Sequence, residues 1–212
     1  MNGEFVRQAA EYYAGKLKTY GADHRGADWS SRESQQLRFE QLLRVCGSEF
    51  ADVNDYGCGY GALADRLAER GAPFRYCGYD AAPEMIEAAI ARRGNDPRCV
   101  FVADRSAVTR RPFTVASGVF YVKQQASVPD WWAYVRDALD DLAALSDKGF
   151  AFNLLTSYSD VERRRPHLFY ASPEDVFRYC IGRFSRHVAV LHDYPLYEFT
   201  VLVRTEGTWH AS

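Results

Sequence analysis

The chain has 212 residues, and 47% of them are hydrophobic, which is enough to bury one core and predicts a single domain over residues 1–212. A formal net charge of −2 argues against nucleic acid as a partner, because proteins that bind it carry a basic surface. Five scattered cysteines, no apolar leader and no long apolar span predict a cytoplasmic protein with reduced thiols, without a structural metal site and without membrane contact.

Two helices are predicted before the first strand. Apolar residues spaced three and four apart predict the first helix over residues 3–20. Ser30 and Glu33 have the spacing of a capping box, which predicts a second helix from there to about Val45. We therefore interpret residues 1–46 as an N-terminal helical extension, or lid, on a cofactor-binding α/β core formed by residues 47–212.

From residue 51 onward, predicted strands and helices alternate. The strands are predicted over residues 51–56, 74–79, 99–103, 114–117, 150–155, 185–191 and 196–204. The helices between them are predicted over residues 61–69, 83–93, 131–145 and 173–182. This alternation predicts a mostly parallel, seven-stranded sheet with helices on both faces. The last two strands are joined by too few residues for a crossover, so they should form an antiparallel hairpin.

A glycine-rich turn follows the first predicted strand, in the run Val53–Leu63. Glycine is needed where the backbone turns sharply and a ligand approaches it closely. The helix that begins just after the turn presents free N–H groups to a polar ligand. The run therefore predicts a site for a nucleotide-like cofactor.

Two cofactor classes fit this turn. Gly57-x-Gly59-x-x-Ala62 satisfies the dinucleotide fingerprint, and Asp80 lies near the distance expected for a ribose-binding acid. An NAD(P)-dependent oxidoreductase is therefore one alternative. Asp55, however, stands two residues before the first glycine, where an anion is a poor neighbour for pyrophosphate and a good one for an ammonium or sulfonium group.

Three acids extend the pattern. Asp55, Asp80 and Asp104 each follow an apolar run, so all three should lie where the carboxyl ends of three strands meet. Read with the third glycine, Gly61, the segments that end in these acids resemble the class I S-adenosylmethionine-dependent methyltransferases, in a small bacterial form. The resemblance covers about residue 45 to the end and implies a Rossmann-like fold.

The resemblance implies S-adenosylmethionine as the cofactor and assigns roles to the three acids. Asp55 would face the methionine end, Asp80 the ribose hydroxyls and Asp104 the adenine amino group. The other residues that it places at the cofactor are Gly57, Gly59, Ala81, Met85, Ser117 and Gly118.

The predicted activity is methyl transfer to an oxygen or nitrogen atom of a small-molecule acceptor. A hydroxyl acceptor would gain from a general base, and histidine is the natural base near neutral pH. His167, in the loop after the fifth strand, is the first candidate, and His24, after the first helix, is the second. The run Arg163–Arg165 is either a solvated charge run or a grip for an anionic acceptor. A non-catalytic cofactor-binding subunit is a further alternative, and the oligomeric state stays open.

Overall fold

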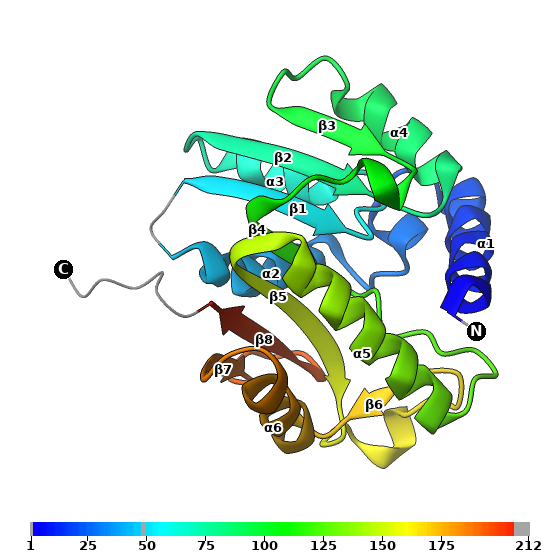
Figure 1. The fold of residues 1–212 in the computed structure, drawn as a ribbon. Coiled ribbons are helices and arrows are strands. Elements are labelled where there is room, and N and C mark those ends of the chain that lie inside the picture. The colour runs from blue at the N-terminus through cyan, green and yellow to red at the C-terminus, as the bar shows by residue number, and fades with distance from the viewer. Residues whose placement is uncertain (1, 48–49, 206–212) are drawn as a thin grey trace.

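In the computed structural model, which describes residues 2–47 and 50–205, one mixed sheet forms the centre of the molecule (Figure 1). Its strands are β1 (Ala51–Tyr56), β2 (Phe74–Tyr79), β3 (Cys99–Val102), β4 (Arg111–Ala116), β5 (Ser146–Thr156), β6 (Tyr170–Ala171), β7 (His187–Leu191) and β8 (Glu198–Arg204). The order is β3-β2-β1-β4-β5-β8-β7, with β6 paired to the end of β5. Among these strands, every pair is parallel except the two that β8 makes with β5 and β7. The predicted α/β sheet with an antiparallel C-terminal hairpin is confirmed.

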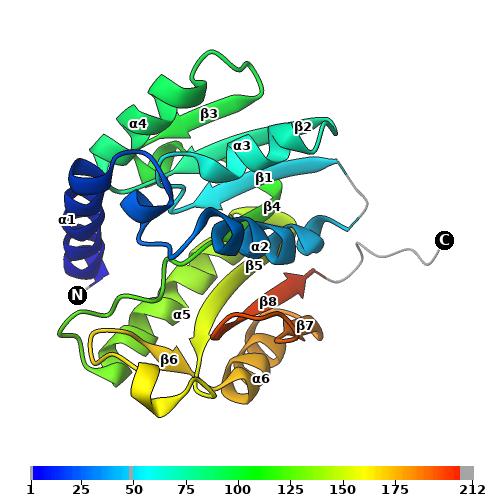
Figure 2. The same ribbon diagram turned by 180° about the vertical axis from the view of Figure 1, so that it is seen from behind.

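Helices cover both faces of this sheet (Figures 1 and 2). They are α1 (Asn2–Tyr20), α2 (Arg32–Leu43), α3 (Ala62–Glu69), α4 (Pro83–Arg93), α5 (Val128–Ala144) and α6 (Pro173–Arg183), with short 3-10 turns η1 (His24–Ala27), η2 (Arg44–Cys46), η3 (Arg105–Ala107) and η4 (Val161–Arg163). Side chains alternate along the strands, so Phe150 and Phe152 pack with α5 and α6, whereas Ala151 packs in the layer of α2, α3 and α4.

The start of α2 differs from the prediction by one residue. Ser31 Oγ accepts a hydrogen bond from the Ser34 N–H (3.1 Å), and Ser34 Oγ accepts one from the Ser31 N–H (3.3 Å). The capping box is therefore formed by these two serines and not by Ser30 and Glu33. A serine hydroxyl at the third helical position reaches back as well as the predicted glutamate would.

The sheet also contains one strand more than the seven predicted. β6 lies inside the predicted loop 156–171 and pairs in parallel with Leu155 and Thr156. Two residues are too few to give an alternating pattern, so the sequence could not reveal this strand. It anchors the end of the long connection between β5 and α6, just before α6 begins.

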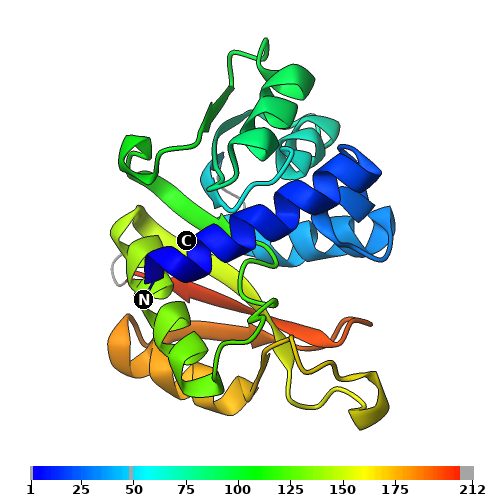
Figure 3. The same cartoon turned by 90° about the vertical axis from the view of Figure 1, so that its right-hand side faces the viewer.

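α1 crosses over the carboxyl ends of the strands (Figure 3). Near its start, Phe5 lies edge-on to Trp131 and Tyr134 of α5, with ring centroids 5.6 and 5.9 Å apart. Farther along, its apolar face packs against Tyr60 and Met85, which lie beside the start of α3 and in α4. α1 therefore bridges the two sides of the sheet across its functional edge.

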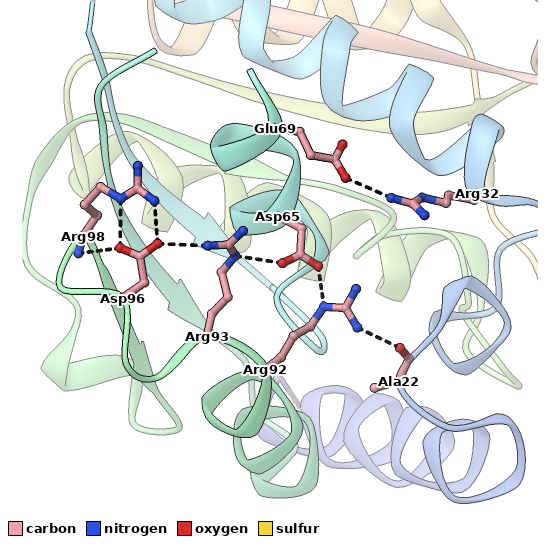
Figure 4. A network of polar contacts seen from close by, with 8 residues as sticks. All are labelled: Ala22, Arg32, Asp65, Glu69, Arg92, Arg93, Asp96 and Arg98. Atoms are coloured by element: carbon pink, nitrogen blue, oxygen red, sulfur yellow. Dashed lines mark hydrogen bonds and ion pairs between the residues drawn. The ribbon is translucent and has the colours of Figure 1, made fainter. Parts of the chain in front are cut away.

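A chain of ion pairs ties this N-terminal part to α3 and α4 (Figure 4). Asp65 of α3 pairs with Arg92 and with Arg93 (2.8 Å) of α4. Arg92 also donates to the carbonyl oxygen of Ala22 (3.4 Å), in the loop after α1. Arg32, at the start of α2, pairs with Glu69 of α3 at 2.9 Å. These links, which range from half-buried to exposed, hold both ends of the N-terminal loop.

The part of the chain that the structure describes contains no helix with both the length and the apolar character needed to cross a membrane.

Candidate functional site

A pocket of about 910 Å³, including the part open to solvent, lies between the strand ends and α1. Its floor is made by the turn after β1, the end of β2 and the turn after β4, and its roof by α1 and the loop that follows. Open α/β sheets bind ligands in crevices at the carboxyl ends of their strands. The predicted edge of the sheet therefore carries a pocket in the place where such ligands bind.

The glycine turn brings the backbone after β1 close to the turn after β4. Gly57 has φ of +80°, which favours glycine, and a β-carbon there would lie 2.5 Å from Val119 Cγ2. The N–H groups of Gly57 and Cys58 donate to the Tyr79 carbonyl oxygen at 2.8 and 2.9 Å. The turn is thus fixed against the end of β2, and no larger residue fits at position 57 without a shift.

Asp80, just after β2, is held by backbone groups on either side. Its Oδ2 accepts the Gly59 N–H (2.8 Å) and its Oδ1 accepts the Ala82 N–H (2.9 Å). Burial raises its pKa, and these two hydrogen bonds oppose that rise. An ionised carboxylate has about four acceptor sites, so two bonds leave capacity for a ligand hydroxyl.

Asp55, at the end of β1, is buried, and its two oxygen atoms differ. Oδ2 accepts a hydrogen bond from the Tyr76 hydroxyl at 2.7 Å, whereas Oδ1 has no hydrogen-bond partner among the described residues. Burial raises the pKa of Asp55 to about 7, with a further rise from Asp80 and an opposing effect from Tyr76. Ser117 Oγ is likewise buried without a partner in the described chain. Both side chains line the pocket.

The structure brings together most of the residues predicted for the cofactor. Those that line the pocket are Asp55, Gly57, Gly59, Asp80, Ala81, Met85, Ser117 and Gly118. Asp104 is different: it is exposed, does not line the pocket and caps η3 by accepting the Ser106 N–H (2.9 Å) and hydroxyl (2.7 Å). These bonds lower its pKa. Its contact with adenine stays a prediction.

Neither candidate base lines the pocket. His24 lies in η1 and lines a neighbouring polar hollow, together with Asp23 and Arg92. His167 is exposed, and its carbonyl oxygen accepts the Lys123 and Gln124 N–H groups at 3.0 and 3.1 Å. Their catalytic roles stay predictions that these positions do not support.

Two arginine side chains of the run beside His167 donate hydrogen bonds to carbonyl oxygens of their own loop. Arg164 donates to the carbonyl oxygens of Ser157 and Ser159, and Arg165 to those of Glu162 and Arg164. These side chains therefore staple the β5–β6 connection. In the described chain, no group of three or more His, Cys, Asp or Glu side chains is placed to hold a metal ion.

Seven aromatic residues line the pocket, none of them was among the predicted site residues, and three show why. Tyr13 comes from α1, Trp29 from the loop after η1 and Tyr134 from α5. The apolar spacing of α1 identified the buried face of that helix but not what the face covers. Trp29 lies in a run, residues 26–30, that is similar to a bacterial branch of the family, but this similarity gave the residue no role at the site.

Comparison with known proteins identifies the family of the chain. Residues 53–144 match the model of a methyltransferase domain. Rv1506c of Mycobacterium tuberculosis H37Rv, a protein named as a methyltransferase, is 45% identical over 152 residues, which are 72% of this chain and 92% of that protein. The chain belongs to the class I S-adenosylmethionine-dependent methyltransferases.

Solved methyltransferase structures share its fold. N-methyltransferase NodS from Bradyrhizobium japonicum WM9, in complex with S-adenosylhomocysteine, superposes with a TM-score of 0.66 at 18% identity, over 93% of this chain and 98% of that one. Magnesium protoporphyrin IX methyltransferase from Synechocystis PCC 6803, with S-adenosylhomocysteine bound, gives 0.64 at 14% identity, over 96% and 97%. The Rossmann-like fold expected from the resemblance is confirmed, and S-adenosylmethionine is the cofactor of this methyltransferase.

Proposed function

We propose that this methyltransferase acts on a nitrogen or oxygen atom of a small-molecule acceptor that binds in the pocket beneath α1. The observation that carries the proposal is that two residues lining the pocket, Asp55 and Ser117, each have a buried oxygen, Oδ1 and Oγ, without a hydrogen-bond partner among the described residues. A buried acceptor left without a hydrogen bond costs free energy, so a ligand with donor groups is favoured there. The ammonium group of a methionine moiety has such donors.

The cofactor contacts follow from this placement. Asp55 and the turn Ser117–Gly118 would hold the methionine end, and Asp80 would accept the ribose hydroxyls. Gly57 and Gly59 would let the backbone approach, with Ala81 and Met85 against the adenosine. Asp104 is retained in the proposal as the acceptor of the adenine amino group, at the end of β3.

The chain's part in the chemistry is to orient the reactants and keep water out. When bound, S-adenosylmethionine supplies an electrophilic methyl group carried on a sulfonium. The aromatic walls at Tyr13, Trp29 and Tyr134 line the space in which an acceptor would meet it. Alignment of two reactants in such a space is worth about 7–11 kcal/mol of the barrier.

We propose that the acceptor atom is a nitrogen or an already ionised oxygen. An alcohol oxygen is the less favoured acceptor. An unprotonated amine attacks with its own lone pair, whereas an alcohol needs a base to reach its full rate. No histidine side chain lines the pocket in the described residues. His167 and His24 remain the proposed bases for a hydroxyl acceptor only if the loops that carry them move toward the pocket.

The same structure supports the proposed organisation of the chain. Residues 1–46 would form a cover on a single domain of residues 1–212, because α1 packs on both α5 and α4 across the pocket. A small molecule fits beneath such a cover, and a net charge of −2 gives no support to nucleic acid as the acceptor. All five cysteines are free and buried, which is typical of proteins from a reducing compartment.

Ligand-induced stabilisation tests the cofactor assignment. S-adenosylhomocysteine at about 100 times its dissociation constant should add about 2.7 kcal/mol to the free energy of unfolding and raise the melting temperature. NADH at the same concentration is the control for the dinucleotide alternative and should leave the melting temperature unchanged. Stabilisation by NADH but not by S-adenosylhomocysteine would overturn the proposal.

The acceptor can then be sought by mass. The protein is incubated with a pool of small metabolites and S-adenosylmethionine that carries a trideuterated methyl group, and new labelled products are identified by mass spectrometry. Asp55→Asn serves as the background control. Labelled product confined to a macromolecular fraction would contradict a small-molecule acceptor.

A further inference from the structure

The wall of the pocket at Trp29 is backed by a buried ion pair. Arg38 of α2 and Glu198 of β8 are 8% and 0% exposed, and Arg38 places both Nη2 (2.6 Å) and Nε (2.8 Å) on Glu198 Oε2. The guanidinium carbon of Arg38 also lies 4.2 Å from the centre of a Trp29 ring. Arg38 therefore joins the loop after η1 to a strand far along the chain.

The contacts continue from Trp29 back to Glu198. A β-carbon on Gly118 would lie 2.3 Å from Trp29 Cη2, so the indole edge lies directly on the turn after β4. The Gly118 N–H donates to Asn153 Oδ1 (2.7 Å), and Asn153 Nδ2 donates to Glu198 Oε1 (3.3 Å). The contacts therefore form a closed circuit of five residues, which are Trp29, Arg38, Gly118, Asn153 and Glu198.

A buried ion pair needs a reason beyond stability. Removing two charges from water costs roughly as much as their attraction returns, so an apolar pair of similar size is often as stable. A guanidinium, by contrast, is planar and directional, and it can fix an aromatic ring from one side while a carboxylate fixes the guanidinium. The pair is therefore suited to holding the indole in one place.

We propose that Arg38 and Glu198 are positioning residues that fix Trp29 as the wall over the turn Ser117–Gly118, and that this wall slows the release of S-adenosylhomocysteine. The inference rests on the proposed function of the pocket, in which this turn holds the methionine end. With the wall in place, the indole covers one side of the turn that holds the methionine end. A loosened indole exposes the same hydrogen bonds to water.

Release of labelled S-adenosylhomocysteine, chased with an excess of unlabelled ligand, tests the proposal. Trp29→Ala and the double variant Arg38→Met/Glu198→Leu should each raise the dissociation rate by about fivefold to tenfold, the range expected for losing one well-packed aromatic contact. Trp29→Phe should restore much of the slow release. Adding Trp29→Ala to the double variant should bring no further increase, since all three residues act through one wall.

Two further variants separate positioning from folding. Arg38→Lys keeps a cation beside Glu198 but loses the planar group over the indole, so it should also release the ligand faster. Arg183→Met/Asp140→Leu removes an exposed Arg–Asp pair (2.9 and 3.0 Å) between α6 and α5 and should release the ligand at the wild-type rate. Hydrogen exchange of residues 24–31 in the ligand-free double variant should be faster, with β1 unchanged.

The outcomes distinguish the two proposals. Failure of the wild-type protein to bind S-adenosylhomocysteine overturns the proposed function. Binding by the wild type, with wild-type release from folded Trp29→Ala, overturns the wall. Fast release from Trp29→Ala, with wild-type release and exchange in Arg38→Lys and in the double variant, shows that Arg38 and Glu198 do not position it.

Discussion

Trp29 and Gly118 touch so closely that the indole occupies the space where any other residue at position 118 would place its β-carbon, 2.3 Å from Trp29 Cη2. Gly118 belongs to the turn after β4, and Trp29 belongs to the N-terminal part that roofs the pocket. The contact therefore joins the cover and the floor of the site at a single point.

Gly118→Ala should weaken S-adenosylhomocysteine binding because the new methyl group must displace the indole or the turn. Gly71→Ala is a matched control: Gly118 and Gly71 have φ of +72° and +70°, but a β-carbon on Gly71 would meet nothing within 4 Å. Both variants should lose about 1–2 kcal/mol of stability from backbone strain. Urea unfolding and ligand titration check the pair, and equal ligand affinities would contradict the prediction.

Asp80→Ala should lower the affinity for S-adenosylhomocysteine about tenfold to a hundredfold, because a hydrogen bond to a charged group is worth about 1.5–3 kcal/mol. The variant also leaves the Gly59 and Ala82 N–H groups without their acceptor. Asp147→Ala removes an exposed carboxylate that pairs with Arg110 (2.9 Å) and should bind as the wild type does. Calorimetric titration measures both, and an unchanged affinity in Asp80→Ala would remove this residue from the site.

The stability of the free protein should depend on pH through Asp55. Its pKa is raised from 3.8 to about 7 in the folded state, chiefly by burial. Between these values the folded protein binds a proton that the unfolded chain does not, so this group makes stability fall as pH rises from about 4 to about 7 and level above that. Asp55→Asn should remove this slope and be more stable than the wild type near pH 8. Urea unfolding across the range gives the difference, and parallel curves would refute the prediction.

Ligand affinity should depend on pH in the opposite sense. A ligand ammonium beside Asp55 favours the ionised carboxylate, so S-adenosylhomocysteine should bind more tightly as pH rises from about 5.5 to about 7.5. Proton release on binding, measured by calorimetry in buffers of different ionisation enthalpy, reports the same linkage. Asp55→Asn should bind weakly and without this dependence; an unaltered pH profile in that variant would place the ammonium elsewhere.

The ion pairs around Asp65 should matter little for stability and only at low salt (Figure 4). Asp65→Asn removes the partner of Arg92 and Arg93, and ion pairs near the protein surface are worth about 0.2–1 kcal/mol each. The loss should shrink in about 1 M salt, where charges are screened within about 3 Å. Urea unfolding at two salt concentrations measures it, and a large, salt-independent loss would show that Asp65 has a packing role.

Local sequence patterns were enough to predict most of the sheet and the floor of the pocket. Each central strand is an apolar run, and the acids at the ends of β1 and β2 lie where such runs end. Asp55 and Asp80 line the pocket for that reason, and their contacts with a cofactor stay predictions. The strand β6 was not predicted, because two residues are too few to show an alternating pattern. Asp104 also follows an apolar run, yet the structure uses its side chain to cap η3.

The contacts that back the roof of the pocket could not be predicted, because they join residues far apart in the chain. Arg38 and Glu198 are separated by 160 positions, and no local pattern pairs them. Their burial becomes visible only when β8 is placed between β5 and β7. The position of Trp29 is equally hard to predict, because it depends on Arg38, which packs against the indole, and not on the neighbours of Trp29 in the sequence.

The place of β8 in the sheet also bears on how the protein is made. Glu198, at the start of β8, is synthesised after Trp29, Arg38, Gly118 and Asn153. Its carboxylate pairs with the Arg38 guanidinium, which packs against the indole. Until β8 has been synthesised, Arg38 lacks the carboxylate with which it pairs in the folded structure. The strands β1, β2 and β4 therefore precede the strand that carries Glu198, and the proposed slow release of the ligand requires β8 to be in place.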